Sequence, residues 1–175
     1  MSLQPARHED PEPSAWIGRF AALVPQGATI LDVAAGGGRH SRFFVQRGHP
    51  VVAVDRDIAA LRGPGIEPVL ADLEGSNPWP LGARRFGGVI VTNYLHRPIL
   101  DAIVGAVAPG GALLYETFAV GNERFGKPSN PDFLLRPGEL LEAVRNRLRV
   151  IAYEDLEVAI PRPAMVQRIA AVNAS

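Results

Sequence analysis

The feature that most constrains the fold is the stretch ILDVAAGGGRHSRFF, residues 30–44. An apolar run that contains a single acid, Asp32, leads into three consecutive glycines and then into a segment with the apolar spacing of a helix. Glycines let the backbone turn sharply and approach a ligand, and the helix that follows points unpaired N–H groups toward it. The stretch therefore predicts a buried strand, a ligand-binding turn and a helix.

The same alternation of strand and helix continues along the chain. Strands are predicted at 29–34, 50–57, 66–72, 86–95, 112–119, 149–159 and 164–174, and helices at 13–25, 38–48, 57–62, 97–111 and 137–148. Near-continuous apolar strands that alternate with helices are typical of a parallel sheet covered on both faces. Since no helix separates the last two strands, we expect an α/β, Rossmann-like three-layer sandwich whose seven-stranded, mostly parallel sheet ends in an antiparallel hairpin.

At 175 residues the chain has the length of one domain. We expect a flexible N-terminal segment at 1–13 and a single domain at 14–175. An irregular stretch at about 118–136 is long for a connection inside a compact domain, and it predicts a lid.

The predicted lid carries aromatic and cationic side chains. Phe118, Phe125 and Phe133 alternate with Arg124 and Lys127. If these side chains face the site, they suit a planar or anionic small substrate. Alternatively, the phenylalanines pack beneath the segment and the cations face solvent.

Composition excludes several classes of protein. The formal net charge is zero, so no sequence-wide field attracts nucleic acid or an anionic membrane, and the basic run RNRLR at 145–149 is read as a solvent-exposed helix end. The absence of cysteine excludes disulfides and thiolate metal sites, and the four histidines lack the spacing of metal ligands. We expect a cytoplasmic protein with no membrane span and no metal, and its oligomeric state stays open.

Acids follow the second and third predicted strands. Asp55 stands where a carboxylate accepts hydrogen bonds from a ribose diol, and Asp72 with Leu73 can meet an exocyclic amine and the face of a purine. The alternatives are a helix N-cap at Asp55 or Asp57 and a solvated loop acid at Asp72. Together with the glycine turn, the acids indicate a nucleoside ligand.

Two adenosine cofactors fit this outline. An NAD(P) site favours a third glycine where this chain has Ser41, and the carboxylate of Asp32 would repel a pyrophosphate bound at the glycine turn. A cationic sulfonium with an amino-acid tail avoids that repulsion. The residues therefore favour S-adenosylmethionine.

Four motifs in this order, ILDVAAGGGRHSRFF, VVAVDRD, LADLEG and FGGVIVTNYLH, resemble class I S-adenosylmethionine-dependent methyltransferases over roughly residues 14–174. The chain is similar to small bacterial members near the tellurite-resistance type, although Ala34 replaces the first glycine of the family's D-x-G-x-G-x-G motif. The resemblance implies S-adenosylmethionine as cofactor and a small molecule as methyl acceptor. It implies a cofactor site made by Asp32, Ala34, Gly36, Gly38, Asp55, Arg56, Asp72, Leu73 and Asn93.

Catalytic candidates are sought near the ends of the fourth and fifth strands, because methyl transfer requires an aligned nucleophile and sometimes a base. Tyr94, His96 and Glu116 lie there. The alternatives are a helix-start histidine that never meets substrate and an ion pair of Glu116 with Arg97 or Arg124. Two further functions stay open: a non-catalytic S-adenosylmethionine-binding module and an NAD(P)-dependent oxidoreductase.

Overall fold

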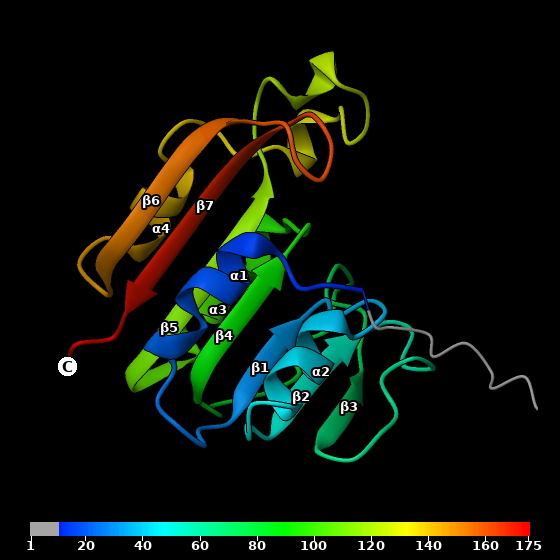
Figure 1. The fold of residues 1–175 in the computed structure, drawn as a ribbon, viewed down its shortest axis with the longest axis vertical. Coiled ribbons are helices and arrows are strands. Elements are labelled where there is room, and N and C mark those ends of the chain that lie inside the picture. Colours follow the sequence, from blue (N-terminus) through cyan, green and yellow to red (C-terminus); the bar gives the residue numbers. More distant parts are fainter. Residues whose placement is uncertain (1–10) are drawn as a thin grey trace, which may run out of the picture.

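The computed structural model describes residues 11–175, and within them seven strands form one sheet in the order β3-β2-β1-β4-β5-β7-β6 (Figure 1). Strands β1 to β5 run parallel to one another, whereas β7 is antiparallel to both β5 and β6. The predicted fold class is confirmed. The strands are β1 Ile30–Val33, β2 Val51–Asp55, β3 Ile66–Leu70, β4 Phe86–Thr92, β5 Val107–Phe118, β6 Arg149–Val158 and β7 Ala164–Val172.

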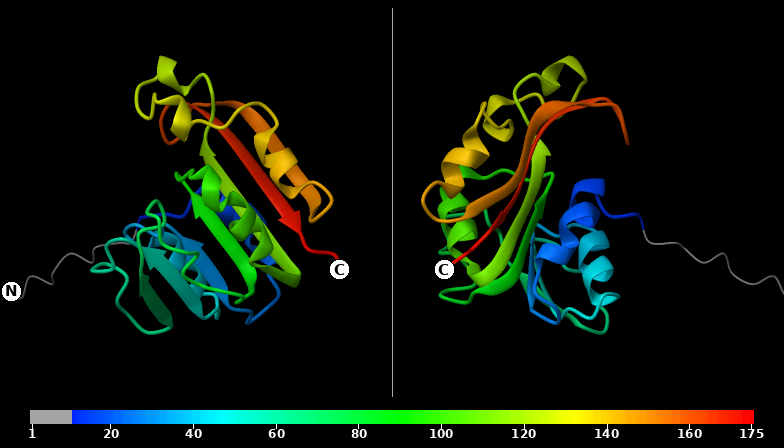
Figure 2. Two further views of the ribbon diagram at one scale, coloured as in Figure 1. Left: turned by 180° about the vertical axis from the view of Figure 1, so that it is seen from behind. Right: turned by 60° about the vertical axis from the view of Figure 1, so that its left-hand side comes forward.

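Helices cover both faces of the sheet, and Figure 2 shows α1 and α2 on one face and α3 and α4 on the other. The α-helices are α1 Ala15–Phe20, α2 Arg39–Val45, α3 Leu100–Gly105 and α4 Glu139–Val144. Short 3-10 turns are η1 Ala21–Leu23, η2 Arg97–Ile99, η3 Asn122–Arg124 and η4 Pro131–Phe133. Most of the segment predicted to be flexible, residues 1–10, lies outside the described residues.

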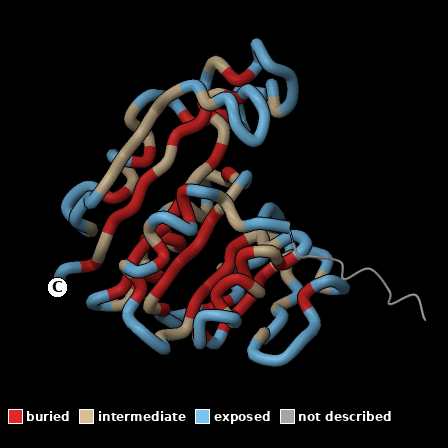
Figure 3. The backbone as a smooth tube through the Cα atoms, in the orientation of Figure 1, coloured by how far each residue is buried: buried red, intermediate tan, exposed pale blue. Residues whose placement is uncertain are grey.

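Two hydrophobic cores fill the space between the sheet and the two helix layers. Ile90 and Leu114 face α1 and α2 and belong to one core, whereas Val89 and Leu113 belong to the core beneath α3 and α4. Buried residues follow the strands through the middle of the molecule (Figure 3). Because successive side chains of a strand point to opposite faces, each strand end sends neighbouring residues to different layers.

Two local predictions were wrong. Residues 57–62 form turns in place of a short helix, and the Asp57 carboxylate accepts a hydrogen bond from the Ala59 amide, 3.0 Å. Asp57 thus closes an Asx turn, which competes with helical backbone bonding. The helix predicted at 97–111 ends at Gly105, because Val107 pairs with Phe86 of β4 and begins β5.

The connection at 119–136 is fixed to the sheet at several points. Ala119 pairs with Leu135, and both residues are buried. The buried Asn122 accepts a hydrogen bond from the Met165 amide over 3.1 Å and donates one to the Pro128 carbonyl over 3.0 Å. The segment between these anchors carries the exposed phenylalanines, and a lid role for it stays a prediction.

Among residues 11–175, no helix is long and apolar enough to cross a membrane. The longest α-helix there, α2, has seven residues. At 1.5 Å of rise per residue it spans about 10 Å, a third of the hydrocarbon thickness of a bilayer.

Candidate functional site

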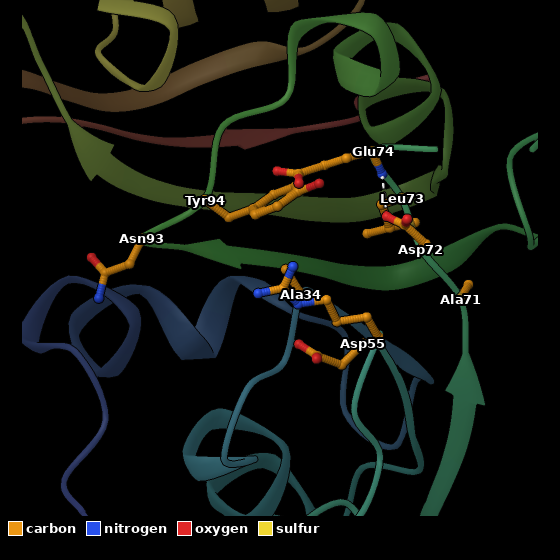
Figure 4. A pocket seen from close by; sticks show the side chains of 9 residues that line it. Ala34, Asp55, Ala71, Asp72, Leu73, Glu74, Asn93 and Tyr94 are labelled. Carbon is orange, nitrogen blue, oxygen red and sulfur yellow. Dashed lines mark hydrogen bonds between the residues drawn. The ribbon is translucent and has the colours of Figure 1, made fainter. Parts of the chain in front are cut away.

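A cavity of about 330 Å³ lies beyond the carboxyl ends of β1 to β4. We call it the strand-end cavity. It adjoins the point between β1 and β4 where the strand order reverses, which is where open α/β sheets bind ligands. Its walls are formed by Ala34, Asp55, Arg56, Ala71, Asp72, Leu73, Glu74, Asn93 and Tyr94 (Figure 4).

Most of the predicted cofactor residues meet in this cavity. The turn after β1 contributes Ala34, the end of β2 contributes Asp55 and Arg56, and the loop after β3 contributes Asp72 and Leu73. Asn93 follows β4 and completes the set. The sequence prediction omitted Ala71 and Glu74, although Glu74 could have been found as the second acid of the LADLEG motif.

The backbone is left-handed at two non-glycine residues of the cavity wall. Ala34 follows β1 with φ 52°, and Asn93 follows β4 with φ 54°. This conformation costs an L-residue with a Cβ roughly 1–2 kcal/mol, although asparagine tolerates it better than alanine. The positive φ explains why a glycine suits position 34, and it places strain beside the cavity.

The glycine turn approaches the helix after it closely. Gly38 has φ 81°, and a Cβ there would lie 2.9 Å from Arg42 Nη1 and 3.0 Å from Leu61 Cδ2. Gly36 is also left-handed, with φ 56°, but it faces open space. The left-handed backbone therefore favours glycine at Gly38, and a Cβ there would also require the Arg42 and Leu61 side chains to shift slightly.

Asp55 joins the glycine turn to the end of β2. Its Oδ2 accepts a hydrogen bond from the Gly36 amide over 2.9 Å, and its Oδ1 accepts one from the Asp57 amide over 2.9 Å. A carboxylate has about four lone-pair sites, so two acceptor positions stay available. Figure 4 shows the Asp55 side chain directed toward Ala34 across the lower wall of the cavity.

Asp72 shapes the third wall. Its Oδ1 accepts a hydrogen bond from the Glu74 amide over 3.0 Å, which folds the loop after β3 into a turn. Leu73 packs partly against the core beneath α3 and α4. Asp72 thus orients its own loop and still lines the cavity, so the loop role and the ligand role are compatible.

Asp32 lies behind the cavity wall and does not line it. The residue is 2% exposed, and its Oδ2 accepts a hydrogen bond from Ser41 Oγ over 2.7 Å. Burial raises the pKa of Asp32 to about 6 in spite of the Ser41 bonds. In the structure Asp32 therefore fixes the start of α2 from below the glycine turn.

His40, the neighbour of Ser41, is held neutral. Burial, followed by the charge of Arg39, lowers the pKa of His40 to about 4. Its Nε2 accepts a hydrogen bond from the Ser14 amide over 3.0 Å. The sequence prediction did not include this link between the N-terminal end of α1 and the helix after the glycine turn.

Tyr94 lines the strand-end cavity, and its hydroxyl is buried beside it. Within residues 11–175 its buried Oη has no hydrogen-bond partner. Burial, then the carboxylates of Glu74 and Asp72, raises the pKa of Tyr94 to about 12. The hydroxyl is thus a neutral donor at physiological pH, and Figure 4 shows Tyr94 and Glu74 on the same side of the cavity.

His96 lines a second cavity of about 390 Å³, which we call the side cavity. Glu74 belongs to both cavities, so the two are neighbours. The lining residues are Glu74, Leu95, His96, Arg97, Pro98, Asp132 and Phe133. Arg124 and Lys127, for which both a substrate-facing and a solvent-facing position were considered, line neither cavity.

Glu116 is the one catalytic candidate that the structure places apart. Its Oε2 forms an ion pair with Arg168 over 3.0 Å, and its Oε1 accepts a hydrogen bond from Ser14 Oγ over 2.7 Å. The ion pair thus involves Arg168 and not the Arg97 or Arg124 considered from the sequence. The strand alternation explains this position, because Tyr115 packs beneath α3 and α4 and its neighbour Glu116 faces α1.

The fold is that of class I S-adenosylmethionine-dependent methyltransferases, as solved structures show. No protein-family model and no curated protein matches the sequence. A Burkholderia thailandensis 1,6-didemethyltoxoflavin-N1-methyltransferase, with bound 1,6-didemethyltoxoflavin and S-adenosylhomocysteine, superposes with a TM-score of 0.67. The two chains are 19% identical, over 93% of this chain and 78% of that one.

Two further structures share this fold. An S-adenosylmethionine-dependent methyltransferase from Mesorhizobium loti has a TM-score of 0.67 at 19% identity, over 90% of this chain and 98% of its own. TehB from Haemophilus influenzae has a TM-score of 0.68 at 17% identity, over 90% of this chain and 61% of its own. These likenesses confirm the predicted fold.

Proposed function

We propose that the protein transfers a methyl group from S-adenosylmethionine to a small-molecule acceptor. One observation carries the proposal: Asp55, with free acceptor positions, lies at the end of β2 in the same cavity as Ala34 of the glycine turn and the Asp72–Leu73 pair. A ribose, the chain attached to it and a purine require these three surfaces. Neighbours of the same fold were crystallised with S-adenosylhomocysteine or sinefungin, which supports the assignment.

The residues of the strand-end cavity fit this cofactor chemically. The unpartnered Tyr94 hydroxyl supplies a donor, and Asp55 and Asp72 supply acceptors for hydroxyl and amine groups. The buried Asp32 lies behind the glycine turn, where negative charge disfavours a pyrophosphate. The set of donors and acceptors therefore favours S-adenosylmethionine over a dinucleotide.

In this proposal each wall of the strand-end cavity binds a different part of the cofactor. Asp55 holds the ribose diol, Asp72 and Leu73 hold the adenine, and Asn93 with Tyr94 borders the reacting end. When bound, S-adenosylmethionine would supply an electrophilic methyl carbon, to which the lone pair of the acceptor bonds while the carbon–sulfur bond breaks and S-adenosylhomocysteine leaves. The protein contributes alignment and exclusion of water, which are the main requirements of such a displacement.

The acceptor enters from the side cavity. That cavity adjoins Tyr94 through Glu74, and it presents the imidazole of His96. A nucleophile that carries a proton needs a base at this place, and His96 is the candidate. Glu116 takes no part, because Arg168 and Ser14 occupy its carboxylate.

Isothermal calorimetry with three ligands tests the proposal. We expect S-adenosylhomocysteine and S-adenosylmethionine to bind and NADH not to bind. Transfer of radiolabelled methyl groups to fractions of a cell extract then tests catalysis. Binding of NADH alone would indicate an oxidoreductase, and S-adenosylmethionine binding with no labelled product in any fraction would favour a non-catalytic binding module.

A further inference from the structure

The side cavity has two carboxylates that no other side chain uses. Glu74 and Asp132 both line it and both are exposed. Among residues 11–175, neither side-chain carboxylate forms a hydrogen bond or an ion pair with another side chain. Both negative charges are thus available to a ligand in the cavity.

The positive charge of the Arg97 guanidinium in the side cavity, by contrast, is already paired with Glu139. Arg97 donates from Nε and Nη2 to the two Glu139 oxygens, 2.6 and 3.0 Å. It also donates to the backbone carbonyls of Asp132, 3.0 Å, and Leu134, 2.8 Å. Although the guanidinium lies near Asp132, its charge is balanced by Glu139, so the cavity presents net negative charge to a ligand.

One wall of the side cavity is aromatic. Phe133 is 47% exposed and lines the cavity, so its apolar ring is accessible to a ligand there. The Arg97 bonds to Asp132 and Leu134 hold the residues on either side of Phe133, and so keep its ring at the cavity. An aromatic face next to carboxylates attracts organic cations through the ring quadrupole.

From this juxtaposition we infer that the side cavity selects a small organic cation, an amine joined to an apolar or aromatic body, as the methyl acceptor. The inference rests on the proposed function and adds the substrate class to it. The amine binds between Glu74 and Asp132, and its apolar body lies against Phe133. An anionic acceptor, which the cations of the 118–136 segment had suggested, is disfavoured because Arg124 and Lys127 are absent from the cavity wall.

The test uses two probes of matched size and opposite charge, 2-phenylethylamine and 3-phenylpropanoate. Their binding is measured by saturation-transfer NMR titration on the full chain, first alone and then with saturating S-adenosylhomocysteine. We expect the amine to bind at least tenfold more tightly than the carboxylate. We expect Asp132→Asn to weaken amine binding about fivefold, the effect of losing one partly solvated charge pair of roughly 1 kcal/mol.

Glu123→Gln is the matched control. It removes an acid of the same segment that lines neither cavity, and we expect amine binding to be unchanged. Equal or tighter binding of 3-phenylpropanoate, or an Asp132→Asn variant that is folded and binds the amine like the wild type, would overturn the inference. Failure of S-adenosylhomocysteine to bind overturns only the cofactor assignment, because the probes are also titrated without it.

Discussion

The Gly36 amide donates a hydrogen bond to Asp55 Oδ2 over 2.9 Å and so ties the turn after β1 to the end of β2. Two segments nearly twenty residues apart thereby form one wall of the strand-end cavity. The carboxylate that we assign to the ribose is already oriented by backbone amides, so the Asp55 side chain does not have to be ordered when the ligand binds.

Replacing Asp55 with asparagine tests this assignment. The variant keeps one oxygen for the Gly36 amide and loses acceptor positions for the two hydroxyls of a ribose. We expect the affinity for S-adenosylhomocysteine to fall about tenfold to a hundredfold, or about 1.5–3 kcal/mol, as measured by calorimetry. Asp57→Asn, at an exposed acid that lines neither cavity, should retain wild-type affinity; equal losses in both variants would remove Asp55 from the ribose.

Replacing Ala34 with glycine should stabilise the protein. The left-handed backbone at φ 52° strains a residue with a Cβ by roughly 1–2 kcal/mol, and glycine costs about 0.5–1 kcal/mol in unfolded-state entropy. We therefore expect a net gain of about 0.5–1 kcal/mol in urea unfolding. Ala35→Gly, at the next position, should destabilise, since Ala35 packs against the core beneath α1 and α2; a loss of stability in Ala34→Gly would contradict the strain argument.

Asp32 and His40 make opposite contributions to the pH dependence of stability. The pKa of Asp32 rises from 3.8 to about 6 on folding, so the folded state binds more protons in this window and stability falls as pH rises. The pKa of His40 falls from 6.5 to about 4, so the unfolded state binds more protons and stability rises with pH. Between pH 4 and 6 the two slopes oppose each other.

Asp32→Asn removes the fall of stability with pH that Asp32 causes, so the rise caused by His40 remains. Denaturant unfolding between pH 4 and 8 should show that the free energy of unfolding rises more steeply with pH than in the wild type. Above pH 6 the variant should be more stable than the wild type by about 3 kcal/mol. Ser41→Ala is the opposite perturbation, because it removes the hydrogen bond that lowers the Asp32 pKa and should destabilise near neutral pH. An Asp32→Asn variant with the wild-type profile would show that Asp32 does not titrate in this range.

The Arg97–Glu139 pair is expected to fix the wall of the side cavity. Both partners are mostly buried, and hydrogen bonds between charged groups are worth about 1.5–3 kcal/mol when one partner is removed. Arg97→Gln and Glu139→Gln should each destabilise by this amount, and the double variant by less than their sum. Thermal unfolding of the three variants measures the coupling, and additive losses would mean that the pair contributes no interaction of its own.

Glu116→Gln separates a structural role from a catalytic one. The change breaks the ion pair with Arg168, which also pairs with Glu154 and lies over the Trp16 ring, 4.9 Å. We expect a lower melting temperature and an unchanged affinity for S-adenosylhomocysteine. Once an acceptor is known, the rate of methyl transfer should also stay within about twofold of the wild type, below the factor of a hundred or more that loss of a general base brings; a larger loss would restore Glu116 as a catalytic candidate.

The sheet and the strand-end cavity could be predicted because the information is local. The second and third strands are short runs that end at or near an acid, and parallel strand ends gather at one edge of a sheet, so Asp55 and Asp72 meet without any long-range knowledge. The turn at 57–62 could not be predicted in this way. Its apolar residues have helical spacing, but the Asp57 carboxylate binds the Ala59 amide and so favours a turn over a helix.

The side cavity and the position of Glu116 were beyond the sequence for a different reason. Phe133 reaches the cavity because Arg97 binds carbonyls 35 and 37 residues further along the chain. The direction of Glu116 depends on which face of β5 packs against which helix layer, and alternation alone does not distinguish the two faces. Contacts between residues far apart in the sequence therefore determine both the wall of the side cavity and the direction of Glu116.

Glu74 stands in the wall of both cavities. Its carboxylate is therefore part of the electrostatic environment of two ligands at once. Thermodynamic linkage then requires that each ligand changes the affinity of the other by the same factor. A saturating acceptor analogue should thus shift the dissociation constant of S-adenosylhomocysteine by the same ratio that S-adenosylhomocysteine shifts that of the analogue, whichever molecule arrives first.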